Sequence, residues 1–213
     1  MKSFSAVSLS TIAGLFLLST AVLASAEINL TPSVSEYVAN GMKTHQLLFR
    51  DDKRKIEYEP PQDWTVGGSE NQLTLKPKKN FAEASITVAS LQKPQAFDEN
   101  TIKILTEQFL ASLPVGSQFG KIEEQVSNPV LLDGNGSVEI TASYQLMGEK
   151  FRRSAIFVNL PHAQLVFRLS ARKDDFQPLH RDFKASILSW HWIDQAAEAS
   201  AESGNAAAAP GAQ

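Results

Sequence analysis

The feature that most constrains the fold is an alternation of apolar and polar residues in the second half of the chain. Apolar side chains occupy every second position of 138–146, with polar ones between them. Leu165, Phe167 and Leu169 recur with the same spacing in 164–171. Because successive side chains of a strand point to opposite faces, this period indicates half-buried strands. We therefore expect a long antiparallel meander over 137–171, with one buried face and one polar face.

Two other stretches have a helical period. The first begins after Asp98 or Asn100, either of which suits an N-cap, and places Ile102, Leu105 and Phe109 on one side. The second begins at Asp174 or Asp175 and is the clearest amphipathic pattern in the chain. Its apolar stripe comprises Phe176, Leu179, Phe183, Ile187 and Trp190. We expect this closing helix to lie on the sheet.

Shorter elements are expected in the first half. Thr31-Pro32 resembles an N-cap followed by proline at the first helical position, which predicts a short helix over 32–40. Strands are expected at 45–49, 55–58, 72–76 and 84–90. The charged run 50–55 is interpreted as a solvated hairpin tip, with a binding patch as the alternative. A hairpin is expected to join 130–132 to 138–146 through the turn 133–136.

The first 26 residues resemble a secretory signal peptide. Lys2 precedes an apolar run over 12–23, and Ala24-Ser25-Ala26 suits a signal peptidase, which predicts a mature start at Glu27. The alternative is a membrane anchor, but the run is shorter than the about 20 apolar residues that span a bilayer. A periplasmic or extracellular protein is expected, with no membrane span after cleavage.

The expected organisation is a signal peptide over 1–26, an N-terminal segment with a short helix over 27–41, one globular domain over 42–194 and a disordered Ala-rich tail over 195–213. The tail contains no large apolar residue to offset the entropy of ordering.

Composition excludes several classes of function. The chain has 20 basic and 23 acidic residues, a net charge of −3, whereas nucleic-acid binding calls for a basic patch. It has no cysteine, which excludes thiolate nucleophiles, zinc–thiolate sites, iron–sulfur clusters and lipidation at a signal cleavage site. Stability must therefore come from apolar burial.

Four segments together resemble the PsbP-like and Mog-like superfamily, which includes the bacterial DcrB-like proteins. They are 58–64 (YEPPQDW), 109–114 (FLASLP), the meander 137–171 and 183–190 (FKASILSW), within a region of about 42–193. The resemblance implies an α+β fold, an antiparallel sheet with helices on both faces (an α/β/α sandwich). It also implies a non-enzymatic accessory or binding role. Relatives assist photosystem assembly or bind a small GTPase, and none of those sites is carried over here.

No catalytic, cofactor or metal signature is present, so no catalytic residue, metal ligand or cofactor is predicted. The leading interpretation is an exported, non-enzymatic accessory or binding protein of the cell envelope whose partner is another envelope protein. The alternative is a secreted hydrolase with a site assembled from distant residues such as His162, Arg168 and Asp174.

The candidate partner surface comprises Trp192, Arg168, Arg172 and Arg152. Packing is the alternative role for Trp192. For the arginines, the alternative is a solvated sheet face that the acidic side of a helix covers. The oligomeric state stays open, and so does the use of the glycosylation patterns at Asn29 and Asn135.

Overall fold

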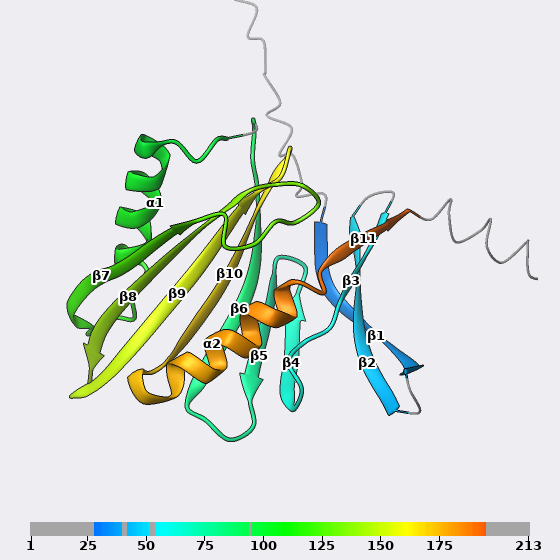
Figure 1. Cartoon of the computed structure of the whole chain (residues 1–213), viewed down its shortest axis with the longest axis horizontal. Helices are drawn as coiled ribbons and strands as arrows, with labels where there is room; N and C mark the ends of the chain where they lie inside the picture. Colours follow the sequence, from blue (N-terminus) through cyan, green and yellow to red (C-terminus); the bar gives the residue numbers. More distant parts are fainter. Residues whose placement is uncertain (1–27, 40–41, 52–53, 94, 195–213) are drawn as a thin grey trace, which may run out of the picture.

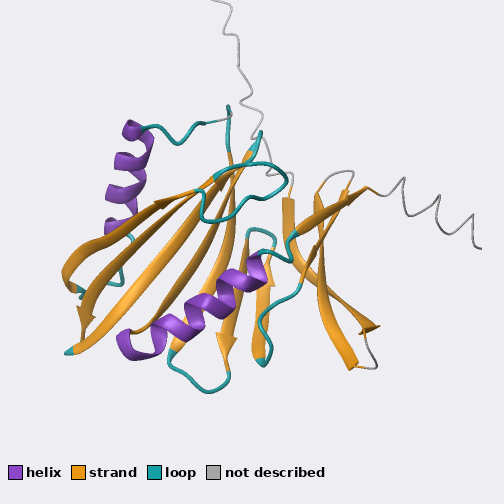
Figure 2. Cartoon of the chain, in the orientation of Figure 1, coloured by secondary structure: helices purple, strands orange, loops and turns teal. Residues whose placement is uncertain are grey.

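The structure is a computed structural model that describes residues 28–39, 42–51, 54–93 and 95–194. These residues form eleven strands in two antiparallel sheets, together with two helices (Figures 1 and 2). The predicted signal peptide and the predicted tail from 195 onward lie outside the described residues.

The larger sheet has seven strands in the order β4-β5-β6-β10-β9-β8-β7. Their bounds are β4 Trp64–Ser69, β5 Gln72–Pro77, β6 Ala82–Ser90, β7 Gln118–Ser127, β8 Ser137–Leu146, β9 Glu149–Asn159 and β10 Ala163–Arg172. The smaller sheet has the order β1-β2-β3-β11. Its strands are β1 Ile28–Ala39, β2 Met42–Asp51, β3 Arg54–Tyr58 and β11 His191–Asp194.

The two helices pack on opposite faces of the larger sheet. Helix α2 (Lys173–Ile187) lies against β9 and β10, in the same apolar cluster as Ile156 and Val158. Helix α1 (Glu99–Ala111) lies against β7 and β8, in a second cluster with Ala155 and Phe157. Because these four residues alternate along β9, both of its faces are buried.

The expected α/β/α sandwich is wrong, since the described chain is mostly strand. One helix on each face does not make a helical layer. On the α2 side, the smaller sheet contributes to the same core as the helix, through Leu47, Phe49, Ile56 and Tyr58. The sequence underestimated the strand content because β4, β7 and most of β1 have no clear alternation of apolar residues.

The helix expected over 32–40 is also wrong, because β1 occupies 32–39. β1 is one of the two edge strands of the smaller sheet, and its pairing with β2 shifts register between Asn29 and Ser33. Pro32 lies inside this shift. Proline, which lacks an N–H, is tolerated at bulges and on edge strands, so Thr31-Pro32 marks a bulge rather than a helix start.

The expected hairpin between 130–132 and 138–146 is replaced by a different pairing. β8 pairs with β7, and Leu132 and Asn135 form only an isolated bridge in the connecting loop. Val130 and Leu132 are buried in the main core, so this loop packs inward instead of forming a ladder.

An aromatic cluster ties the smaller sheet to the larger one. Trp190 is 3% exposed and its ring centroid lies 5.5 Å from those of Phe49 and Phe167 and 5.6 Å from that of Tyr58. Trp190 follows the end of α2 rather than belonging to it. The apolar stripe predicted for the closing helix is buried in full, as expected, but its last member packs between the sheets.

Candidate functional site

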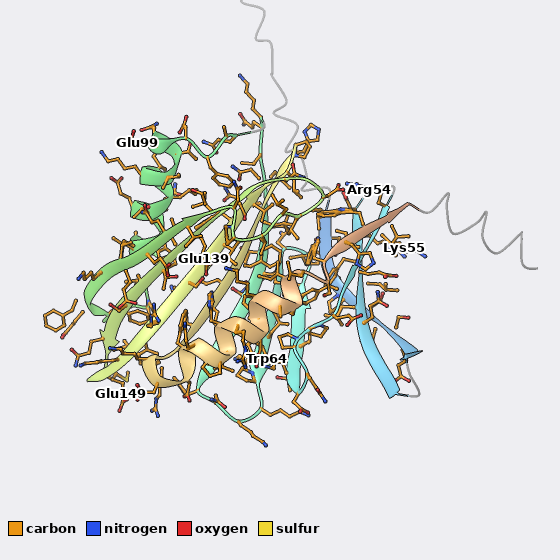
Figure 3. The ribbon with its side chains drawn as sticks, in the orientation of Figure 1. Arg54, Lys55, Trp64, Glu99, Glu139 and Glu149 are labelled. Carbon is orange, nitrogen blue, oxygen red and sulfur yellow. The ribbon has the colours of Figure 1, made fainter. Side chains whose placement is uncertain are left out.

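Four exposed apolar side chains gather at one end of the larger sheet, where the β8–β9 and β5–β6 turns and the segment from α1 into β7 meet. We call this group the apolar tip. It comprises Phe81 (70% exposed), Val115 (101%), Phe119 (79%) and Met147 (96%). Figure 3 labels Glu149, the first residue of β9, at this end of the sheet. Phe81 and Phe119 both lie next to Phe151, and exposed apolar side chains that gather in this way mark interaction sites more often than isolated ones do.

Two members of the apolar tip have backbone conformations that their side chains disfavour. Phe119 has φ 54° and Met147 has φ 51°, both in the left-handed region. Met147 and Gly148 form the two-residue β8–β9 turn, a position at which Asn, Asp or Gly is normally preferred. A non-glycine residue held there costs of order 1–3 kcal/mol. Since neither side chain is buried, packing in the free protein does not explain why phenylalanine and methionine occupy these two positions.

Exposed cations surround the apolar tip. Lys79 lies in the β5–β6 turn, Lys150 is the second residue of β9 and Lys173 begins α2. The guanidinium of Arg172 lies over the ring of Phe81, with its Cζ 5.5 Å from the ring centroid. Glu149, Asp174 and Asp175 lie among these cations, and Arg172 is 3.9 Å from Glu149, so this end of the molecule carries charges of both signs beside its apolar side chains.

A cavity of about 550 Å³ opens on the α1 side of the larger sheet, next to the apolar tip. We call it the arginine groove, because Arg153 of β9 and Arg168 of β10 line it together with Tyr144, Phe151 and Phe81. Arg153 pairs across the strands with Ser170, and Arg168 pairs with Ala155. The two arginines are therefore diagonal neighbours on one face of the sheet.

The two arginines of the groove differ in their partners. Arg153 donates from Nε to Ser170 Oγ (2.7 Å) and from Nη1 to the carbonyl of Ser112 (2.6 Å), and its guanidinium lies 5.8 Å from the ring of Tyr144. Arg168 Nε is buried and has no hydrogen-bond partner among the described residues. Burial lowers the pKa of both guanidinium groups, and Arg168 lowers that of Arg153 further.

A second polar cluster lies under α2. Glu139 of β8 is 3% exposed and accepts hydrogen bonds from Ser154 Oγ (2.6 Å) and Lys184 Nζ (3.0 Å), and its Oε1 lies 2.5 Å from His180 Nε2. Figure 3 shows Glu139 on the larger sheet beside α2. Burial alone would raise the pKa of Glu139, but these hydrogen bonds lower it to about 2. This cluster joins α2 to the sheet.

The structure does not bring the four predicted surface residues together. Arg168 lines the arginine groove and Arg172 borders the apolar tip, whereas Arg152 lies on the α2 side, with its guanidinium over the ring of Phe176 and 2.7 Å from Glu123. Trp192 belongs to β11, not to a helix, and donates to Asp51 at 2.5 Å beneath the guanidinium of Arg54.

Sequence reasoning missed Arg153, Phe119 and Met147. The signal for Arg153 was its position between Phe151 and Ala155 on one face of β9. An apolar residue in the predicted turn at Met147 was a signal for the tip.

The residues suggested for a hydrolase site do not converge. Arg168 lines the arginine groove, His162 lines another cavity of about 460 Å³, and Asp174 lines a third. The cavity of His162 also contains Asp51, Arg54 and Asp133, but both carboxylates are bound to Arg54. No group of three or more His, Asp or Glu side chains in the described part of the chain is placed to hold a metal ion.

Most of the chain matches a solved fold. The solution structure of cyanobacterial PsbP (CyanoP) from Synechocystis sp. PCC 6803 superposes with a TM-score of 0.50 and 12% sequence identity, over 83% of this chain and 99% of that one. This is a PsbP-like fold. At such identity the match concerns the fold alone.

Other comparisons add nothing to the PsbP-like assignment. The crystal structure of PA94, a protein of unknown function from Pseudomonas aeruginosa, matches 72% of this chain and 93% of its own at 16% identity, but its TM-score of 0.38 carries no argument. No family profile and no curated protein sequence matches this chain. Neither of its described helices is long and apolar enough to cross a bilayer.

Proposed function

We propose that this chain is an exported, non-enzymatic accessory protein of the cell envelope, and that it binds another envelope protein through the apolar tip. The signal-peptide pattern of 1–26 supports export, and the PsbP-like fold supports an accessory role. The order of the elements supports a place among the bacterial DcrB-like proteins.

The observation that carries the proposal is the strained exposure of Phe119 and Met147. Both side chains are almost wholly exposed and both have positive φ, so they destabilise the free protein. Asparagine would suit either backbone position better. A binding partner that covers these side chains supplies the favourable burial that the isolated chain does not.

The charges around the apolar tip indicate the chemistry of the partner. Lys79, Lys150 and Lys173 are exposed beside apolar side chains. Complementary charge steers association and selects partners. Glu149, Asp174 and Asp175 are interspersed with the cations, so the partner surface is expected to combine an apolar patch with charged side chains of both signs.

The proposal predicts that the double variant Phe119→Asn, Met147→Asn keeps its fold and loses its partner. Asparagine tolerates the left-handed conformation, and little packing is removed, so the melting temperature should stay equal or rise. Immobilised wild-type chain should capture a protein from an envelope fraction that the double variant does not retain. Mass spectrometry of the two eluates measures the difference.

The matched control is Leu131→Asn, which removes an exposed leucine (64%) from the loop at the opposite end of β8. It should capture the same protein as the wild type. The docking proposal fails if the double variant also retains that protein, or if the wild type binds phosphatidylglycerol vesicles through the same two residues. Hydrolytic turnover by the purified chain, lost on His162→Ala, would contradict the non-enzymatic assignment.

A further inference from the structure

The arginine groove holds more positive charge than its own side chains neutralise. Lys76, Arg153 and Arg168 line it, and Glu83 is the only carboxylate in the lining. Glu83 lies 3.0 Å from Lys76. Glu83 also interacts electrostatically with Arg153, so three cations share one carboxylate in the groove, and no ion pair among the described residues holds Arg168 there. A guanidinium stays protonated at neutral pH, so both charges persist when they are desolvated.

Arg168 is the less satisfied of the two. Its Nε is buried and unpartnered among the described residues, while the Nε of Arg153 is held by Ser170. A partly buried cation without an anion is unfavourable, and an anionic group supplied by a ligand relieves this penalty. The guanidinium fork is also the side-chain group best suited to bind a carboxylate or phosphate through two parallel hydrogen bonds.

The register of the sheet places an aromatic wall next to these cations. Tyr144 pairs with Phe151, and the next residues on the same face are Ala142 and Arg153. The rings of Tyr144 and Phe151 stack with centroids 5.5 Å apart, and Phe81 lies edge-on at 6.2 Å from Phe151. One end of the groove is therefore apolar, and the other is cationic.

We propose that the arginine groove binds a small organic anion, whose carboxylate or phosphate is held by Arg168 and Arg153 and whose apolar body lies against Phe81, Tyr144 and Phe151. The volume of about 550 Å³ is within the range of about 300–1,000 Å³ that is usual for small-molecule sites. A bare inorganic anion would leave the aromatic wall unused. This inference goes beyond the docking function, because it concerns a cavity that adjoins the apolar tip at Phe81 and a different ligand.

The test uses 8-anilinonaphthalene-1-sulfonate, a fluorescent aromatic anion, and N-phenyl-1-naphthylamine, which has the same rings without the sulfonate. The wild-type chain should bind the anion at least tenfold more tightly than the amine. Decanoate or decyl phosphate should displace it, and decanol should not. Displacement by decanoate alone assigns the head group to a carboxylate, and displacement by decyl phosphate alone assigns it to a phosphate.

Arg168→Met should weaken binding of the sulfonate at least tenfold. It should also raise the melting temperature of the free protein by about 2–4 °C, because it replaces an uncompensated charge by an apolar side chain of similar length. An arginine with a purely structural role would lower the melting temperature instead. The matched control is Arg181→Met, which removes an exposed arginine of α2 on the other side of the sheet and should leave binding unchanged.

Unchanged binding by Arg168→Met, equal displacement by decanol and decanoate, or a lower melting temperature in Arg168→Met would overturn the inference. The experiments distinguish failure of the anion-binding proposal from failure of the docking proposal. The Phe119→Asn, Met147→Asn variant should keep the sulfonate site while losing the captured protein, and Arg168→Met should do the reverse.

Discussion

Replacing Phe183 by alanine should destabilise the protein by about 3–5 kcal/mol, the usual range for a buried phenylalanine. Phe183 is 2% exposed, and its ring stacks on that of Trp64 with centroids 6.1 Å apart. The side chain of Phe183 therefore packs α2 against the core and also contacts the edge strand β4. Alanine would leave a cavity between α2 and β4, and the surrounding side chains would have little freedom to move in and fill it. Chemical denaturation at neutral pH measures the loss in the free energy of unfolding.

The matched control for this substitution is Gln177→Ala, at an exposed position of the same helix. It should change the unfolding free energy by less than about 0.5 kcal/mol. An unchanged denaturation midpoint in Phe183→Ala would mean that α2 does not pack on the sheet as described.

Glu139→Gln should destabilise the protein by about 3 kcal/mol at neutral pH. Glutamine resembles the protonated carboxyl, and the pKa of Glu139 falls from its ordinary 4.5 to about 2 in the folded state. A pKa lowered by folding contributes stability above the unfolded value, and that contribution disappears as the pH falls toward the folded value. The gap in unfolding free energy between wild type and variant should therefore close between about pH 4.5 and pH 2.

Glu124→Gln is the control for Glu139→Gln, because Glu124 lies on β7 with its side chain exposed. It should follow the wild-type pH dependence throughout. A gap between wild type and Glu139→Gln that stays constant down to pH 2 would show that the carboxylate is not held by His180, Ser154 and Lys184 in the folded state.

Local patterns predicted the elements whose signals are contained in a few neighbouring residues. The alternation along β10 placed Leu165, Phe167 and Leu169 in the core, and all three are buried. Asp98 caps α1 by accepting from the amide of Thr101 at 2.7 Å, as one of the two predicted caps. The stripe of α2 and the strands of the β5–β6 hairpin were found for the same reason.

Pairing between distant segments was not predictable in this way. The polar residues Glu139 and Thr141 were expected on an open face, yet both are buried, at 3% each. Their alternation indicates that they share a face, but not that α2 covers it. Pro32 likewise reads as a helix start until β2 is placed beside it.

The candidate site depended on register in the same way. Arg152 and Arg168 were grouped from the sequence, but the pairing of Arg152 with Ala171 turns it toward α2 and leaves Arg153 beside Arg168. A shift of one residue in register exchanges the two faces of a strand. No local feature of β9 specifies which residue of β10 lies opposite.

By itself, the sequence determined the periods of its strands and helices, the apolar residues that each would bury, and the absence of cysteine chemistry. Only the tertiary structure decided that the chain forms two sheets rather than a layered sandwich, that Glu139 is enclosed, and that two arginines share one groove. The reason is physical. Periodicity and capping are properties of neighbouring residues, whereas register and coverage are set by which distant segments pack together.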